Sequence, residues 1–112
     1  KIAEGRIKFF NRLKITTNNA TYIFEGLYTS ILELLHSIVA KEGYKVLNHI
    51  CLGYYLRDKI KREDLFRIFD DLRYKRNSIV YYGKEIDFLT AKGTIEKAKR
   101  LIKEITNFQP HF

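Results

Sequence analysis

The sequence predicts an all-α protein, an up-and-down bundle of four to five helices formed by a single domain over residues 1–112. Apolar residues recur at spacings of three and four along most of the chain, and no stretch alternates convincingly as a strand would. The segments between the periodic stretches are short, which favours antiparallel neighbours. With 46% hydrophobic residues and one proline, 112 residues can bury one core but are too few for two.

The first two helices are predicted from the N-terminus to about residue 14 and over residues 20–41. Between them, "TTNNA" (16–20) offers turn and N-cap residues. "KEGYK" closes the second helix, since Gly43 can adopt the left-handed conformation that follows many helices. In the first helix Ile2, Ile7, Phe10 and Leu13 are the expected apolar contacts, and the second carries one apolar stripe: Phe24, Leu27, Ile31, Leu34, Leu35 and Ile38.

Three further helices are predicted at about residues 47–57, 62–82 and 91–108. Asn48 is expected at the start of the first of these helices. A loop at residues 83–89, which could include a short extended piece, separates the other two. The third helix carries Ile50, Cys51, Tyr54, Tyr55 and Leu56, and the buried stripe expected in the fifth is formed by Ala98, Leu101, Ile102, Ile105 and Phe108.

Charge and composition point to a cytoplasmic protein with a polyanionic partner. Lys and Arg outnumber Asp and Glu by 21 to 13, a formal charge of +8, which favours RNA or a nucleotide. No apolar run approaches the ~18 residues of a membrane span. The single cysteine, Cys51, fits a reducing compartment and the role of a small buried hydrophobe.

Few residues suggest a familiar catalytic site. The sequence contains no phosphate-binding glycine loop, no nucleophile elbow and no acidic metal cluster, so neither a cofactor nor a metal is predicted. His36 and His49 lack the neighbours of a metal site, and a structural role is the simplest interpretation of both.

The fourth helix carries the least expected residue. Leu65, Phe69 and Leu72 follow a four-three spacing that continues to Arg76, which places an arginine in an apolar seam. Such an arginine is either paired with an acidic residue of another helix, for which Glu25 and Glu33 are candidates, or it serves a ligand. Arg73, Asn77 and Tyr81 share an adjacent strip, and Tyr74 flanks them.

The stretch "KRNSIVYYG" (75–83) resembles the signature of the HEPN domains, small helical bundles found with nucleotidyltransferases and in toxin–antitoxin systems. That signature is an arginine, usually followed by a polar residue, and a histidine four to six positions after the arginine. "YTSILELLHSIVAKEGYKVLNHICLGYYL" (28–56) also looks like the second and third helices of that family, so the resemblance covers about residues 20–105.

The resemblance implies roles for particular residues. Arg76 matches the motif arginine and Asn77 the polar residue, whereas Tyr81 stands where the family has histidine. In RNase members two chains dimerise and bring both motifs to one cleft, where the ribose 2′-hydroxyl attacks the adjacent phosphate without a metal. By this likeness Arg76, Asn77 and Tyr81 are the candidate catalytic residues, and the residues around them are candidates for binding RNA or nucleotide: Arg73, Tyr74, Lys75, Tyr82 and Lys84.

Three functions remain open at this point. The first is a homodimeric module that binds RNA or nucleotide at a basic cleft, as the substrate-binding partner of a nucleotidyltransferase. The second is a metal-independent endoribonuclease, as in the toxin of a toxin–antitoxin pair. The third is an inert helical adaptor. A phenol with a pKa near 10 is a poor base at neutral pH, so Tyr81 favours binding over catalysis.

Overall fold

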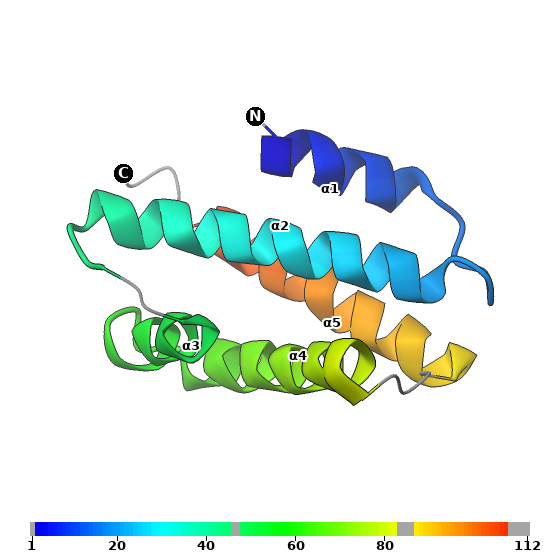
Figure 1. Ribbon diagram of the computed structural model, residues 1–112. Helices are drawn as coiled ribbons and strands as arrows, with labels where there is room; N and C mark the ends of the chain where they lie inside the picture. Colours follow the sequence, from blue (N-terminus) through cyan, green and yellow to red (C-terminus); the bar gives the residue numbers. More distant parts are fainter. Residues whose placement is uncertain (1, 46–47, 83–86, 108–112) are drawn as a thin grey trace.

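The computed structural model describes residues 2–45, 48–82 and 87–107, and these form five α-helices (Figure 1). They are α1 (Ile2–Arg12), α2 (Ala20–Lys41), α3 (His49–Asp58), α4 (Glu63–Tyr82) and α5 (Phe88–Thr106). No strand occurs among the described residues. The all-α bundle predicted from the sequence is therefore confirmed.

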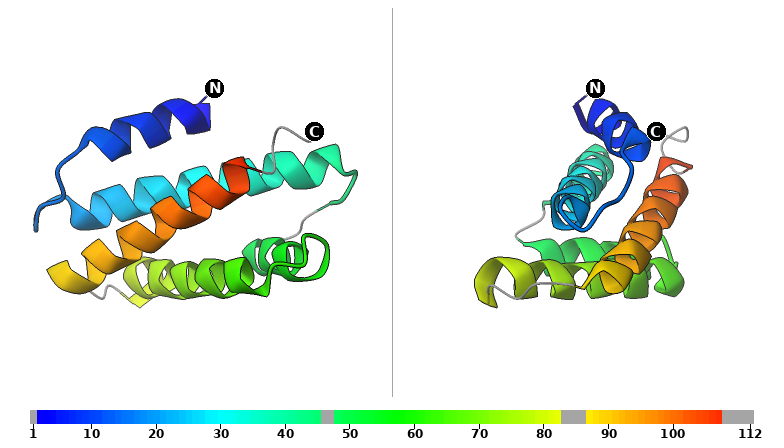
Figure 2. Two further views of the ribbon diagram at one scale, coloured as in Figure 1. Left: turned by 180° about the vertical axis from the view of Figure 1, so that it is seen from behind. Right: turned by 90° about the vertical axis from the view of Figure 1, so that its right-hand side faces the viewer.

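The bundle is built around α2, which contacts each of the other four helices. α1 packs on one side of α2, whereas α3 and α4 lie on the other side and α5 crosses behind (Figures 1 and 2). Helices joined by one connection, such as α1 with α2 and α4 with α5, run in opposite directions (Figures 1 and 2). α2 and α5 run in the same direction, because two further helices separate them in the chain (Figure 2).

The apolar stripe of α2 forms the centre of the core, as its spacing predicts. All six of its predicted stripe residues are buried, with exposed fractions between 0% and 6%. By length and composition α2 is also the one described helix that could cross a membrane, but 56% of that stretch is buried inside the protein. A long apolar core helix of this kind is what the packing of four neighbours requires.

The contact between α1 and α2 depends on a glycine. Phe10 is 4% exposed, and its ring lies directly against the backbone of Gly26, where a β-carbon would overlap the ring. Arg6 of α1 also donates a hydrogen bond to Glu33 of α2. The pairing of Glu33 with Arg6 leaves Glu25 as the acidic residue of α2 available to α4.

The helix ends follow the predicted turn chemistry with one exception. Asn19 precedes α2, but its side chain accepts a hydrogen bond from the Thr16 N–H (2.7 Å) and makes no cap bond to the helix. Gly43 has the predicted positive φ, +82°, and the Asn48 side chain accepts from the Cys51 N–H (3.1 Å), as an N-cap does. Asn19 thus stabilises the turn rather than the helix.

The last helix begins earlier than its apolar pattern predicts. Asp87 caps α5 by accepting hydrogen bonds from the Thr90 N–H (2.9 Å) and hydroxyl (2.8 Å). The predicted loop at residues 83–89 is therefore wrong at its end, and residues 83–86 lie outside the described part. In α5 the predicted stripe from Ala98 to Ile105 is buried, and Phe108 lies outside the described residues.

The apolar and aromatic residues of α3 divide between an exposed and a buried side, and the prediction that Cys51 is buried is only partly met. Ile50 is 41% and Tyr54 44% exposed, and Cys51 is only half-buried. The short α3 packs through a different side, formed by Leu52, Gly53, Tyr55 and Leu56. Ten residues are too few for periodicity to define the buried side unambiguously, so the contact with α4 decides it.

Candidate functional site

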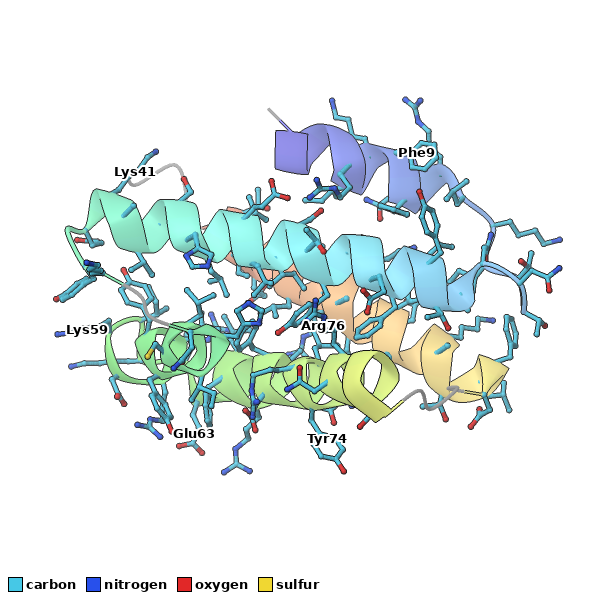
Figure 3. All side chains as sticks on the ribbon, viewed as in Figure 1. Phe9, Lys41, Lys59, Glu63, Tyr74 and Arg76 are labelled. Atoms are coloured by element: carbon cyan, nitrogen blue, oxygen red, sulfur yellow. The ribbon has the colours of Figure 1, made fainter. Side chains whose placement is uncertain are left out.

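Arg76 lies at the contact between α4 and α2. Leu65, Phe69 and Leu72, which precede it along the seam of α4, are each no more than 1% exposed. The Arg76 side chain is 26% exposed, and Figure 3 shows it between the ribbons of α2 and α4. The seam position predicted from the four-three spacing is therefore confirmed, and it brings a guanidinium to the edge of the core.

The nearest charge to Arg76 comes from α2. Arg76 Nε lies 3.9 Å from Glu25 Oε1, too far for a hydrogen bond. That oxygen is buried and has no hydrogen-bond partner among the described residues. The Arg76 guanidinium carbon also lies 5.8 Å from the centre of the Tyr28 ring, within the range of a cation–π contact. Arg76 and Glu25 are thus close in space, but no hydrogen bond joins their side chains.

Other arginines of the protein are bonded differently. Among the described residues, the carboxylate that Arg76 approaches is that of Glu25, at a distance too long for a hydrogen bond, although the guanidinium has five N–H donors. Carboxylates accept hydrogen bonds from the remaining arginines that lie near acidic residues, namely Arg6, Arg57, Arg62, Arg67 and Arg73. The half-buried guanidinium of Arg76 therefore has N–H groups that are available to a further acceptor.

Tyr28 connects Arg76 to a histidine. Its hydroxyl lies 3.4 Å from Nδ1 of His49, and the two rings meet edge to face at 6.0 Å. On another side the Tyr28 ring stacks on Phe69 at 6.1 Å. Burial raises the pKa of Tyr28 to about 12, so its phenol keeps its proton at neutral pH.

The pKa of His49 also depends on the positive charges of Arg76 and Arg73. Burial, followed by the positive charge of Arg76 and smaller contributions from His36 and Arg73, lowers the pKa of His49 below its ordinary value. Arg73 lies on this flank of α4 and donates to Asp70 at 2.9 Å and 3.1 Å. We call Glu25, Tyr28, His49, Arg73 and Arg76 the Arg76 cluster.

The structure separates the remaining candidate residues. Tyr74 is 66% exposed and extends from the outer side of α4 (Figure 3), away from the Arg76 cluster. Lys75 lies on the flank that faces α5, where it donates to Asp71 at 3.0 Å and Lys97 approaches the same carboxylate at 3.4 Å. The structure therefore does not bring Tyr74 and Lys75 to the Arg76 cluster, because successive helical residues point about 100° apart, and their predicted contacts with RNA or nucleotide stay predictions.

Asn77 is half-exposed and lies beside Arg73 on the flank of α4. The side chains of Tyr81 and Tyr82, and the whole of Lys84, lie outside the described part of the structure. Their predicted roles stay predictions.

Sequence reasoning missed two members of the Arg76 cluster. Tyr28 and His49 belong to α2 and α3, and no spacing in the chain connects them with Arg76. The sequence motif contains no histidine, yet the fold brings an imidazole to the Tyr28 ring beside Arg76. Tertiary packing is the only source of this arrangement.

Within the described residues, no three His, Cys, Asp or Glu side chains gather as metal ligands would. Comparison of the chain with protein-family models, with curated proteins and with solved structures finds no match. The Arg76 cluster therefore has to be interpreted from its own chemistry.

Proposed function

We propose that this chain is a HEPN-like helical-bundle protein that binds RNA or a nucleotide, with Arg76 as the principal contact to phosphate. The observation that carries this proposal is the half-buried guanidinium of Arg76, whose nearest carboxylate oxygen, Glu25 Oε1, lies beyond hydrogen-bond distance at 3.9 Å. Among the described residues its nitrogens are not buried atoms without a partner, so a ligand can reach them. A ligand that accepts from the guanidinium gains charge-assisted hydrogen bonds.

A phosphate group suits this guanidinium well. Arginine presents N–H donors in a planar fork that matches two phosphate oxygens, and such charge-assisted bonds are about twice as strong as neutral ones. Arg73 adds a second cation on the same flank, although Asp70 partly neutralises it. The formal charge of +8 supports the approach of a polyanion.

Binding is tested with a fluorescein-labelled oligouridine in an anisotropy titration. Arg76→Met should weaken binding by at least about tenfold, the order expected for loss of a charge-assisted hydrogen bond of ~1.5–3 kcal/mol. Arg67→Met is the matched control, because Arg67 lies on the same helix, is 75% exposed and pairs with Glu63. Equal affinities of wild type and both variants would refute the proposed role of Arg76.

A second candidate function is a metal-independent endoribonuclease. The observation that favours it is His49, an imidazole close to Arg76 in a protein whose motif has Tyr81 in place of histidine. Imidazole is the side chain best matched to proton transfer near neutral pH.

Cleavage of one labelled RNA by four proteins tests this candidate. We expect wild-type cleavage to be absent or at least ~100-fold slower than that of Tyr81→His, the lower range for a general acid–base group. Tyr81→Phe and Arg76→Met are the comparisons. Robust wild-type cleavage that Tyr81→Phe abolishes would make the phenol catalytic and displace the binding role.

The proposal includes a homodimer, a cytoplasmic location and a nucleotidyltransferase as partner protein. Phe66 of α4 packs on Tyr54 of α3 within the same chain, with the ring centres 6.2 Å apart. Tyr74 and Ile50 remain exposed on α4 and α3 as contacts for a partner. Light scattering at micromolar concentration should give a dimer mass, and a monomer mass would refute this assembly.

A further inference from the structure

His49 is surrounded by groups whose charge a bound anion would change. Tyr28 of α2 lies against the His49 ring, and His36 of α2 and Arg73 and Arg76 of α4 act on it through their charge. All the charges that act on the imidazole are positive or become positive on protonation, so they oppose its protonation in the unliganded protein. Glu25, the acidic residue of the Arg76 cluster, lies beside Arg76.

Tyr28 determines which nitrogen of His49 is available to a ligand. In the tautomer of the neutral imidazole that has its proton on Nε2, the Tyr28 hydroxyl donates to Nδ1. When His49 is protonated, Nδ1–H donates instead and the Tyr28 oxygen accepts. The hydroxyl therefore accommodates both protonation states, and Nε2–H is a donor in each of them.

We propose that His49 is the proton-linked member of the Arg76 cluster: a phosphodiester that binds at Arg76 also draws a proton onto the His49 imidazole. This inference rests on the proposed function and assigns to it a ligand residue and a pH dependence. The bound phosphate offsets the positive charges of Arg73 and Arg76, which add to the effect of burial in disfavouring the imidazolium. The imidazolium then adds a third charged donor to the site.

The direction of the effect follows from linkage. His49 takes up a proton on binding if its pKa in the complex is higher than in the free protein, so affinity rises as the pH falls between those two values. A rise of one pKa unit corresponds to about a tenfold gain in affinity on acidification. Below the pKa of the free protein, His49 is protonated in both states and the gain is complete.

The experiment measures oligouridine binding from about pH 8 to about pH 5, around the ordinary histidine pKa of about 6.5. The RNA lacks a terminal phosphate, because a phosphomonoester itself titrates near pH 6. Wild-type affinity should increase about tenfold on acidification. His49→Gln should bind at all pH values as weakly as wild type does at the alkaline end.

His36→Gln is the matched control, since His36 is exposed on α2 and acts on His49 only through its charge. It should keep most of the pH dependence. NMR titration of the wild-type histidines gives a second measurement that needs no substitution in the site. The His49 signal should titrate below about 6.5 in the free protein and at a higher pH in the complex.

Two failures are distinguishable. If Arg76→Met abolishes binding but wild-type affinity does not change with pH, or if His49→Gln retains the full pH dependence, the assignment of His49 is wrong and the phosphate site stands. If Arg76→Met binds as wild type does and RNA leaves the His49 titration unchanged, the proposed function is wrong as well.

Discussion

Replacement of Arg76 by methionine should remove RNA binding without destabilising the protein. Methionine has a similar length and an unbranched, flexible side chain that can fill the end of the seam below Leu72. A residue that serves only the fold should behave in the opposite way, because breaking a buried ion pair leaves an uncompensated charge. Stability and binding measured on one variant therefore separate the two roles.

The expected change in the free energy of unfolding is small because opposing effects nearly cancel. Loss of the contact with Glu25 at 3.9 Å costs roughly 0–1 kcal/mol, since both side chains are partly exposed, 26% and 35%. Loss of the approach to the Tyr28 ring at 5.8 Å costs about 0.5–1 kcal/mol. Replacing the guanidinium by an apolar thioether at the edge of the core returns roughly 1 kcal/mol, about the value of one buried CH₂ group. The net effect should lie within about 1 kcal/mol of zero.

Urea unfolding followed by far-ultraviolet circular dichroism measures this quantity. The comparison includes Glu25→Gln and the double variant, because a double-mutant cycle isolates the interaction between the two side chains. We expect a coupling energy below about 1 kcal/mol, as for exposed pairs. Glu25→Gln alone should strengthen oligouridine binding, since the neutral amide no longer repels phosphate.

A loss of about 3 kcal/mol or more in Arg76→Met, with a coupling of similar size to Glu25, would refute this reasoning. Arg76 would then be a structural ion pair. Unchanged RNA binding by the folded variant would lead to the same conclusion.

Three further predictions concern packing, pH and salt. Gly26→Ala should destabilise the protein by about 1–3 kcal/mol, because the new methyl group overlaps the Phe10 ring, whereas Gly93→Ala, with open space around it, should stabilise α5 by about 0.5–1 kcal/mol in the same urea assay. Because the pKa of His49 is lower in the folded protein than its unfolded value of about 6.5, its contribution to stability is complete above that pH. The urea midpoint should therefore fall as the pH drops through the pKa of the folded state, and it should fall less in His49→Gln. Equal pH profiles of the two proteins would contradict the lowered pKa. The slope of log affinity against log salt should decrease in size by about one in Arg76→Met but not in Arg67→Met, and equal slopes in the two variants would argue against a specific phosphate contact.

The helices and their buried stripes could be predicted from the sequence because the signal is local. Residues three and four apart share one side of a helix, so the stripe of α2 from Phe24 to Ile38 indicates both the helix and its buried side. The same spacing places Arg76 in the seam of α4. For the ten-residue α3 this signal is too short, and Tyr54 is exposed despite its apolar neighbours.

The composition of the candidate site was decided by tertiary structure alone. The sequence offers two acidic partners for Arg76, and packing selects Glu25 because Arg6 of α1 bonds to Glu33. It offers no histidine at the expected spacing, yet the approach of α3 to α2 brings His49 to Tyr28. Contacts between helices depend on how whole surfaces pack, and no periodicity within one helix encodes them. The position of Arg76 in its seam was thus determined by the sequence, and its neighbours by the fold.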